Sequence, residues 1–131
     1  MTTLTIKTKN RIEMVDITYL ISEAIEESDI KDGLCLVFVP HTTAAVTINE
    51  NADPDVQRDI LASLSSIVPF PGNYRHREGN ADAHIKASLM GDSQTIMIEN
   101  GKLLLGTWQA LFFCEFDGPR TRQVIVKVIA C

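Results

Sequence analysis

The sequence has little of what would place it in a membrane, in a fibre or outside a reducing compartment. Its longest apolar run, residues 34–39, is far shorter than the roughly 18 residues of a membrane-spanning helix. Residues 1–9 contain no apolar stretch typical of a signal peptide. No repeat or low-complexity segment is present, which excludes collagen, coiled coils and disordered tails. We therefore expect a cytoplasmic protein with no membrane partner.

Cysteine is scarce, and the three that occur form no recognisable pair. Cys35 and Cys114 lie within apolar runs, Cys131 is the last residue, and there is no CxxC motif. An odd number of such residues indicates buried free thiols in a reducing compartment. The alternative is a nucleophilic Cys114, although Glu115 beside it is an anion and no adjacent cation would lower the pKa of its thiol.

Basic residues are in the minority. Twelve lysines and arginines against 17 acidic residues give a formal charge of −5, which opposes binding to polyanions and argues against a nucleic-acid partner. Apolar residues make up 45% of the 131 positions, which is enough to build a core without a disulfide or a structural metal. We expect one domain that covers residues 1–131.

Hydrophobic patterning predicts an α+β fold with about seven strands and about three helices, because strands follow one another without regular helix alternation. Asp16 and Asp53 are candidate N-caps for the first two helices, and Pro54 is a typical first helical residue. Trp108 is expected in the core. The predicted strands are residues 4–7, 34–39, 44–49, 95–99, 102–105, 108–116 and 123–129, and the predicted helices are residues 17–28, 54–67 and 83–90.

Motifs for nucleotide binding, zinc proteases and serine hydrolases are absent, but polar residues gather at the ends of the predicted elements. All three histidines lie there or in the aperiodic segment 69–82, which is long enough to be functional. Imidazole suits both metal ligation and proton transfer near neutral pH. The alternative for each histidine is an ordinary surface residue, and for Asp53 it is helix capping. The histidines are His41, His76 and His84, and the basic residues near them are Arg75, Arg77, Lys86, Arg120 and Arg122.

Five blocks of residues, in order along nearly the whole chain, resemble the YjbQ family, also called the secondary thiamine-phosphate synthase family. The resemblance implies a YjbQ-like β-sheet sandwich with helices packed on it, and a homotrimer. The blocks are His41-Thr42-Thr43-Ala44, Asn49-Glu50-Asn51-Ala52-Asp53-Pro54, Gly72-Asn73-Tyr74 with His76, residues 84–91, and Gly106-Thr107-Trp108-Gln109 with residues 115–120.

The resemblance also implies a weak thiamine-phosphate synthase activity, which couples hydroxymethylpyrimidine diphosphate to thiazole phosphate. The site would then receive a phosphorylated small molecule at the N-terminus of the short helix 83–90 and at nearby cations. The three histidines would either bind a divalent metal, Zn²⁺ or Mg²⁺, or donate to the leaving diphosphate. The expected catalytic residues are His41, Glu50, Asp53 and His84; the expected phosphate or substrate ligands are Thr42, Thr43, Asn49, Arg75, Lys86, Gln109 and Arg120; the expected metal ligands are His41, His76 and His84.

Two other classes of function stay open. The chain is alternatively a homotrimeric module that binds a metal or a phosphorylated metabolite without turnover, or a structural trimer whose polar loops are only surface. The apolar stretch 103–116 is a candidate subunit interface, and an interface there would place the site between subunits.

Overall fold

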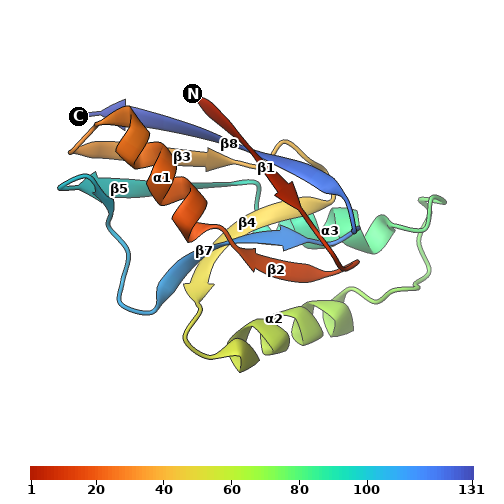
Figure 1. Ribbon diagram of the computed structural model, residues 1–131. Helices are drawn as coiled ribbons and strands as arrows, with labels where there is room; N and C mark the ends of the chain where they lie inside the picture. Colours follow the sequence, from red (N-terminus) through yellow and green to blue (C-terminus); the bar gives the residue numbers. More distant parts are fainter.

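The computed structural model describes all residues 1–131, with eight strands and three helices (Figure 1). It confirms the α+β class. The elements are β1 (Thr2–Lys7), β2 (Glu13–Asp16), α1 (Thr18–Ser28), β3 (Gly33–Phe38), β4 (Ala44–Glu50), α2 (Pro54–Ile67), α3 (Ala81–Met90), β5 (Ser93–Glu99), β6 (Lys102–Leu103), β7 (Gln109–Glu115) and β8 (Thr121–Ala130).

The strands form two antiparallel sheets. The larger sheet has the order β1-β8-β3-β5-β6, and the smaller has the order β2-β7-β4. One face of the small sheet packs with α1 against the large sheet in a core that contains Ile21, Val37, Phe113 and Val124. None of the three helices is long and apolar enough to span a membrane.

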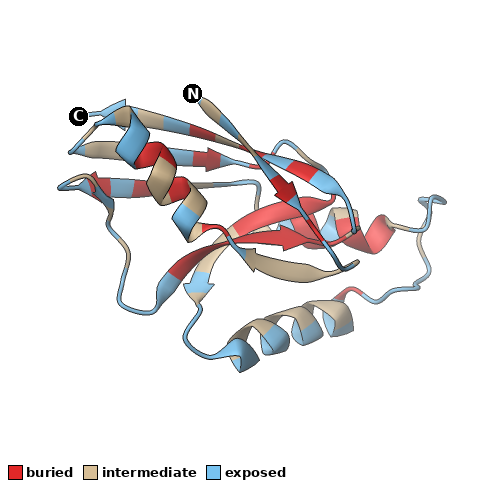
Figure 2. Ribbon diagram, in the orientation of Figure 1, coloured by how far each residue is buried: buried red, intermediate tan, exposed pale blue.

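The small sheet is covered on both faces. Its second face packs against α3 and the partly buried side of α2, in a cluster that includes Ala83, Ala87, Phe112 and Phe116. Every residue of β7 after Gln109 is therefore buried (Figure 2). The expectation that residues 103–116 form a subunit interface is wrong for β7, because its side chains are already covered by their own chain.

Most sequence-predicted elements are present, with shifted ends. The strand β2 was not predicted, because its four residues Glu-Met-Val-Asp do not alternate clearly, and it is fixed by pairing with β7. Asp53 caps α2 as expected, since its Oδ1 accepts from the Asp55 amide at 2.9 Å. Asp16 instead lies one residue before the N-cap of α1, where it accepts from the amide and hydroxyl of Thr18.

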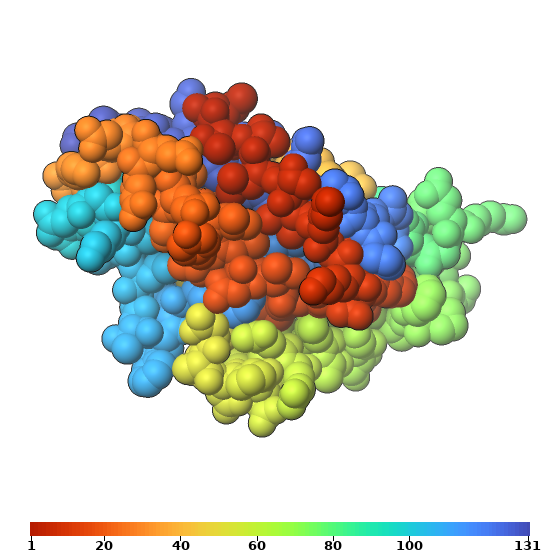
Figure 3. Space-filling model, in the orientation of Figure 1, coloured from red at the N-terminus to blue at the C-terminus, as the bar shows by residue number.

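The connection from α2 to α3 has no regular structure over residues 68–80, in agreement with the sequence pattern. It projects from the body of the molecule in the space-filling view (Figure 3). Its beginning, just after α2, is fixed at Arg11, whose guanidinium carbon lies 3.6 Å from the centre of the Phe70 ring. Such a cation–π contact links this loop to the β1–β2 connection.

Candidate functional site

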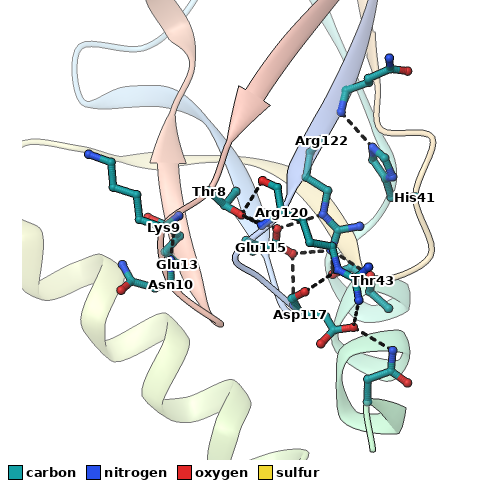
Figure 4. A network of polar contacts seen from close by, with 12 residues as sticks. Thr8, Lys9, Asn10, Glu13, His41, Thr43, Glu115, Asp117, Arg120 and Arg122 are labelled. Carbon is teal, nitrogen blue, oxygen red and sulfur yellow. Dashed lines mark hydrogen bonds and ion pairs between the residues drawn. The ribbon is translucent and has the colours of Figure 1, made fainter. Parts of the chain in front are cut away.

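The site begins where β3 ends. The pairing of β3 with β8 ends with Phe38 opposite Ile125, and Pro40 follows soon after. The next unpaired amide of β8 on this side, that of Gln123, donates to His41 Nε2 at 2.9 Å. The His41 side chain thus completes the hydrogen bonding that the strand no longer supplies (Figure 4).

A buried ion pair lies beneath His41. Arg122 of β8 donates through Nε to Glu115 Oε1 at 2.9 Å and through Nη2 to Glu115 Oε2. Glu115 also accepts from the Thr8 hydroxyl at 2.7 Å and from the Asp117 amide at 3.1 Å (Figure 4). Burial by itself would raise the pKa of Glu115, but the hydrogen bonds from Arg122 and Thr8 outweigh it and lower the pKa. Glu115 is therefore held as a carboxylate.

The same arginine holds the polypeptide next to His41. Arg122 Nη2 donates to Thr43 Oγ1 at 2.9 Å, and Thr43 is buried. Thr43 was predicted to contact phosphate; the structure gives its hydroxyl a partner inside the protein. From the sequence alone, Arg122 is only one of several cations near the histidines, and its pairing with Glu115 is not predicted. Its position at the start of an apolar strand is the one feature of the sequence that indicates a buried partner, because an unpaired charge there would be costly.

A pocket of about 540 Å³ opens beside this network and contains two of the three histidines. His41 approaches it from the β3–β4 connection, and His84 approaches it from α3. Ser88 lies one turn after His84 on the same face of α3, because residues four apart in a helix are neighbours. The full lining is His41, Thr42, Ala44, His84, Ala87, Ser88, Gly91 and Asp92.

His76 approaches the pocket only through His84. The two rings meet edge to face, with their centres 5.1 Å apart. Together with Tyr74, Arg75 and Ile85 they line a second hollow of about 290 Å³, so His84 is common to both cavities. The structure thus brings the loop 68–80 to the site, as the sequence predicted, and places Arg75 in this second hollow.

The three histidines do not form a metal site within one chain. No group of three or more histidine, cysteine, aspartate or glutamate side chains is placed to hold a metal ion. The Nε2 atom of His41 is occupied by the Gln123 amide. A Zn²⁺ or Mg²⁺ ion therefore does not fit these residues in the single chain, and we derive no chemical step through a metal.

The beginning of α3 is not open to phosphate. Asp82 in its first turn is buried and binds Arg11 in bidentate geometry, with Nη–Oδ distances of 2.9 and 3.2 Å. Lys86 is 1% exposed, and its Nζ lies 2.9 Å from Asp82 Oδ2. Burial acts to raise the pKa of Asp82, but its hydrogen bonds from Arg11 and Lys86 lower it overall. The prediction that Lys86 and this helix terminus bind phosphate is therefore wrong within the single chain, because both are occupied by buried ion pairs.

Arg120, another predicted phosphate ligand, is turned toward its own loop. Its Nε donates to the Asp117 carbonyl at 2.7 Å and its Nη2 to the Asp117 carboxylate at 2.8 Å. The side chain remains half exposed. It contributes positive charge near His41 without lining the pocket.

A second group of predicted residues lies at the opposite end of the small sheet. Ala44 pairs with Glu115 at one end of β4 and Glu50 pairs with Gln109 at the other, so about 20 Å of strand separates them. Within one chain, the structure does not bring this group to His41. The group comprises Asn49, Glu50, Asp53 and Gln109. Trp108 lies beside them and is 62% exposed, so the prediction that it lies in the core is wrong.

Neither buried thiol suits nucleophilic attack. Burial raises the pKa of Cys114 to about 12 and that of Cys35 to about 11. Both side chains are fully buried, and Cys131 is exposed at the end of the chain. The alternative of a Cys114 nucleophile is therefore wrong.

Asp53→Ala is expected to lower the free energy of unfolding by about 1 kcal/mol, because the variant loses the N-cap of α2. It should leave diphosphate affinity and any coupling activity unchanged, since Asp53 lies far from His41 in the same chain. Urea denaturation and calorimetric titration with diphosphate would measure the two effects. Loss of coupling in a folded variant would instead assign Asp53 to the site of a neighbouring copy.

The architecture and the site define a class: small α+β proteins in which a doubly covered three-stranded sheet carries a two-histidine pocket at one end. The sequence profile described as "UPF0047 protein YjbQ-like" matches residues 2–131. The chain therefore belongs to the YjbQ/UPF0047 family, as its motifs indicated.

Relatives in archaea and bacteria are similar over almost their entire length. The chain is 60% identical over 124 residues to the UPF0047 protein MJ1081 of Methanocaldococcus jannaschii, with 95% of this chain and 90% of that protein covered. It is 51% identical over 128 residues to the Bacillus subtilis protein YugU, with 97% of each covered.

Solved structures have the same fold. A YjbQ/UPF0047 protein of Clostridium acetobutylicum superposes with a TM-score of 0.97 at 59% identity, covering 98% of this chain and 100% of that one. A Sulfolobus solfataricus protein gives a TM-score of 0.95 at 34% identity, covering 99% and 96%. The latter is described as YbjQ-like and of unknown function.

Proposed function

We propose that the chain is a small-molecule enzyme that binds a phosphorylated ligand in the pocket between His41 and His84. The observation that carries this proposal is the convergence of two imidazoles, from two different elements, on one pocket of about 540 Å³. The N–H groups of the two imidazole rings and the Thr42 hydroxyl can donate hydrogen bonds to phosphoryl oxygens, whereas the Ser88 hydroxyl already donates to the His84 carbonyl at 2.9 Å. Such donors also stabilise negative charge that develops on a leaving group.

For the reaction itself, we propose thiamine-phosphate synthesis as a secondary activity, on the strength of the family resemblance. The bond between the pyrimidine methylene carbon and the diphosphate oxygen breaks, and that carbon forms a bond to the thiazole nitrogen. The residues at the pocket would hold the departing diphosphate as its charge develops. The physiological substrate is expected to share this phosphorylated chemistry.

His84→Ala is expected to weaken diphosphate binding by about tenfold or more, because one hydrogen bond to a charged group contributes about 1.5–3 kcal/mol. Isothermal titration calorimetry with inorganic diphosphate would measure the affinity, and a coupling assay with both precursors would measure turnover. Tyr19→Ala, on the exposed side of α1, is the matched control and should behave as the wild type. Wild-type binding and turnover in a folded His84→Ala variant would refute the site.

The same experiments address the second class of function. Tight diphosphate binding without turnover of any phosphorylated precursor would favour a binding module over an enzyme. Absence of both binding and turnover would favour a protein whose polar loops are only surface.

We also propose that three copies assemble. The outer face of the large sheet carries an apolar row in which Leu34 of β3 pairs with Met97 on one side and Ile129 on the other. Met97 is 58% exposed and Ile129 is 44% exposed. Apolar side chains in adjacent strands form a contiguous patch that a second copy would bury. Analytical ultracentrifugation should give three times the chain mass of 14.5 kDa, and a monomer mass at micromolar concentration would refute the assembly.

A further inference from the structure

The hydrogen bond at His41 restricts the chemistry of its ring. The Gln123 amide is a donor that lies 2.9 Å from Nε2, so Nε2 must offer its lone pair. A neutral imidazole has one N–H and one lone pair. With the lone pair committed at Nε2, the hydrogen of neutral His41 must be on Nδ1.

The backbone donor cannot be turned away from the ring. Gln123 directly follows Arg122, whose guanidinium is held by Glu115 and Thr43 in the buried network. On its other side, β8 is paired with β1 in a register that sets Gln123 opposite Thr5. Two sets of hydrogen bonds therefore fix this part of β8, and protonation of Nε2 would set two N–H groups against each other.

The electrostatic surroundings also favour the uncharged ring. Burial lowers the pKa of His41, and the positive charge of Arg122 lowers it further. Arg120 acts in the same direction, whereas the Glu115 carboxylate acts in the opposite one. Across the pocket the titratable side chains are His84 and Asp92.

The second nitrogen of the ring is available to a ligand. His41 lines the pocket, and its Nδ1 has no hydrogen-bond partner within the chain. The Nδ1 atom is also not one of the buried side-chain atoms without a hydrogen-bond partner, so its lack of a partner does not come from burial. Nδ1 therefore reaches accessible space while Nε2 is occupied.

We propose that His41 serves this pocket at neutral pH as an uncharged hydrogen-bond donor, through Nδ1–H, to an anionic oxygen of the ligand. The inference rests on the proposed phosphoryl-binding function for the identity of the ligand, but the tautomer is a property of the protein alone. His41 is then neither a general base through Nε2 nor a metal ligand through that atom. A proton transfer in this pocket would have to use a different group.

The tautomer can be tested without a ligand. Long-range ¹H–¹⁵N correlation spectra of protein labelled in histidine, assigned with a His41→Gln variant, distinguish the two neutral tautomers and the imidazolium. We expect His41 to be protonated at Nδ1 and unprotonated at Nε2 at pH 7. An Nε2-protonated neutral ring, or an imidazolium at pH 7, would overturn the proposal.

Two substitutions separate the donor from the structural contact. In His41→Gln, the side-chain oxygen can replace Nε2 as acceptor for Gln123, but the donor at the Nδ1 position is lost. In His41→Asn, the shorter amide can replace Nδ1 as donor, but the acceptor for Gln123 is lost. Donor and acceptor are thus removed one at a time.

We expect His41→Gln to keep the wild-type unfolding midpoint and to bind inorganic diphosphate about tenfold or more weakly, whereas His41→Asn should lose stability and retain more of the affinity. Equal diphosphate affinity in the wild type and in His41→Gln would overturn the donor role. Failure of the wild type to bind diphosphate would overturn the proposed function and the ligand named here, while the spectrum of the free protein would still decide the tautomer.

Discussion

Arg122→Met is expected to lower the free energy of unfolding by about 3–5 kcal/mol at pH 7, the range for removing one partner of a buried ion pair. The variant leaves Glu115, which is fully buried, without the two guanidinium hydrogen bonds that it receives in the wild type. The Thr8 hydroxyl and the Asp117 amide remain, but neither carries a charge. Urea denaturation followed by circular dichroism would measure the loss.

The size of this loss should depend on pH. In the wild type the pKa of Glu115 is lowered from 4.5, so its contribution to stability is present above that value and lost as the pH falls through the folded-state pKa. In Arg122→Met the cation that outweighs burial is gone, and the pKa of Glu115 rises. The variant therefore loses stability as the pH increases from about 4 to 7, and the difference between the two proteins should widen over that interval.

Arg120→Met is the matched control for this experiment. Arg120 lies two residues away and pairs with Asp117 at a half-exposed position, where ion pairs contribute about 0–1 kcal/mol. A double variant, Arg122→Met with Glu115→Leu, removes both charges and should recover part of the stability. If Arg122→Met were no less stable than Arg120→Met, the buried pair would not hold the fold together.

Asp82→Ala is expected to lower the free energy of unfolding by a similar amount, about 3–5 kcal/mol. The substitution leaves Lys86 as a buried cation without a partner and removes the contact between Arg11 and α3. Lys86→Met should cost clearly less, since Asp82 keeps its bidentate contact with Arg11. The expected order follows from the number of charged partners: Asp82 has two, and Lys86 has one. Urea denaturation of both variants would establish the order.

Asp55→Ala is the control for the loss of an aspartate near a helix N-terminus. Asp55 pairs with Arg58 on the exposed surface of α2, and its removal should change stability by less than about 1 kcal/mol. Lys86→Met should also bind diphosphate like the wild type, because Lys86 is buried against Asp82 and does not line the pocket. A larger loss for Lys86→Met than for Asp82→Ala would contradict the described network.

Much of the fold could be predicted from local patterns, and what could not depends on contacts between distant segments. The Asp53-Pro54 pair predicted the start of α2 because capping is a local interaction. The strand β7 was predicted from its apolar residues, but burial on both faces arises only because α3 and the large sheet pack on opposite sides of it. In the sequence, a strand that is covered on both faces appears only as a continuous apolar run, which does not show what covers it.

The candidate site shows the same division. His41 and His84 were both predicted, and the fold brings them to one pocket. Glu50 was grouped with them because it also follows a strand, but sequence position does not reveal that β4 starts at the pocket and ends about 20 Å away. The pairing of Arg122 with Glu115 joins two different sheets through side chains, which no spacing in the sequence encodes.

The exposed position of Trp108 bears on how this protein can be observed. It is the only tryptophan, and it lies on the surface at the end of the small sheet that is distant from His41. This residue is already 62% exposed in the folded chain, so unfolding should change its fluorescence emission maximum little. A partner or a second copy that covers this end would shift the emission to shorter wavelength, which makes Trp108 a built-in reporter of association rather than of folding.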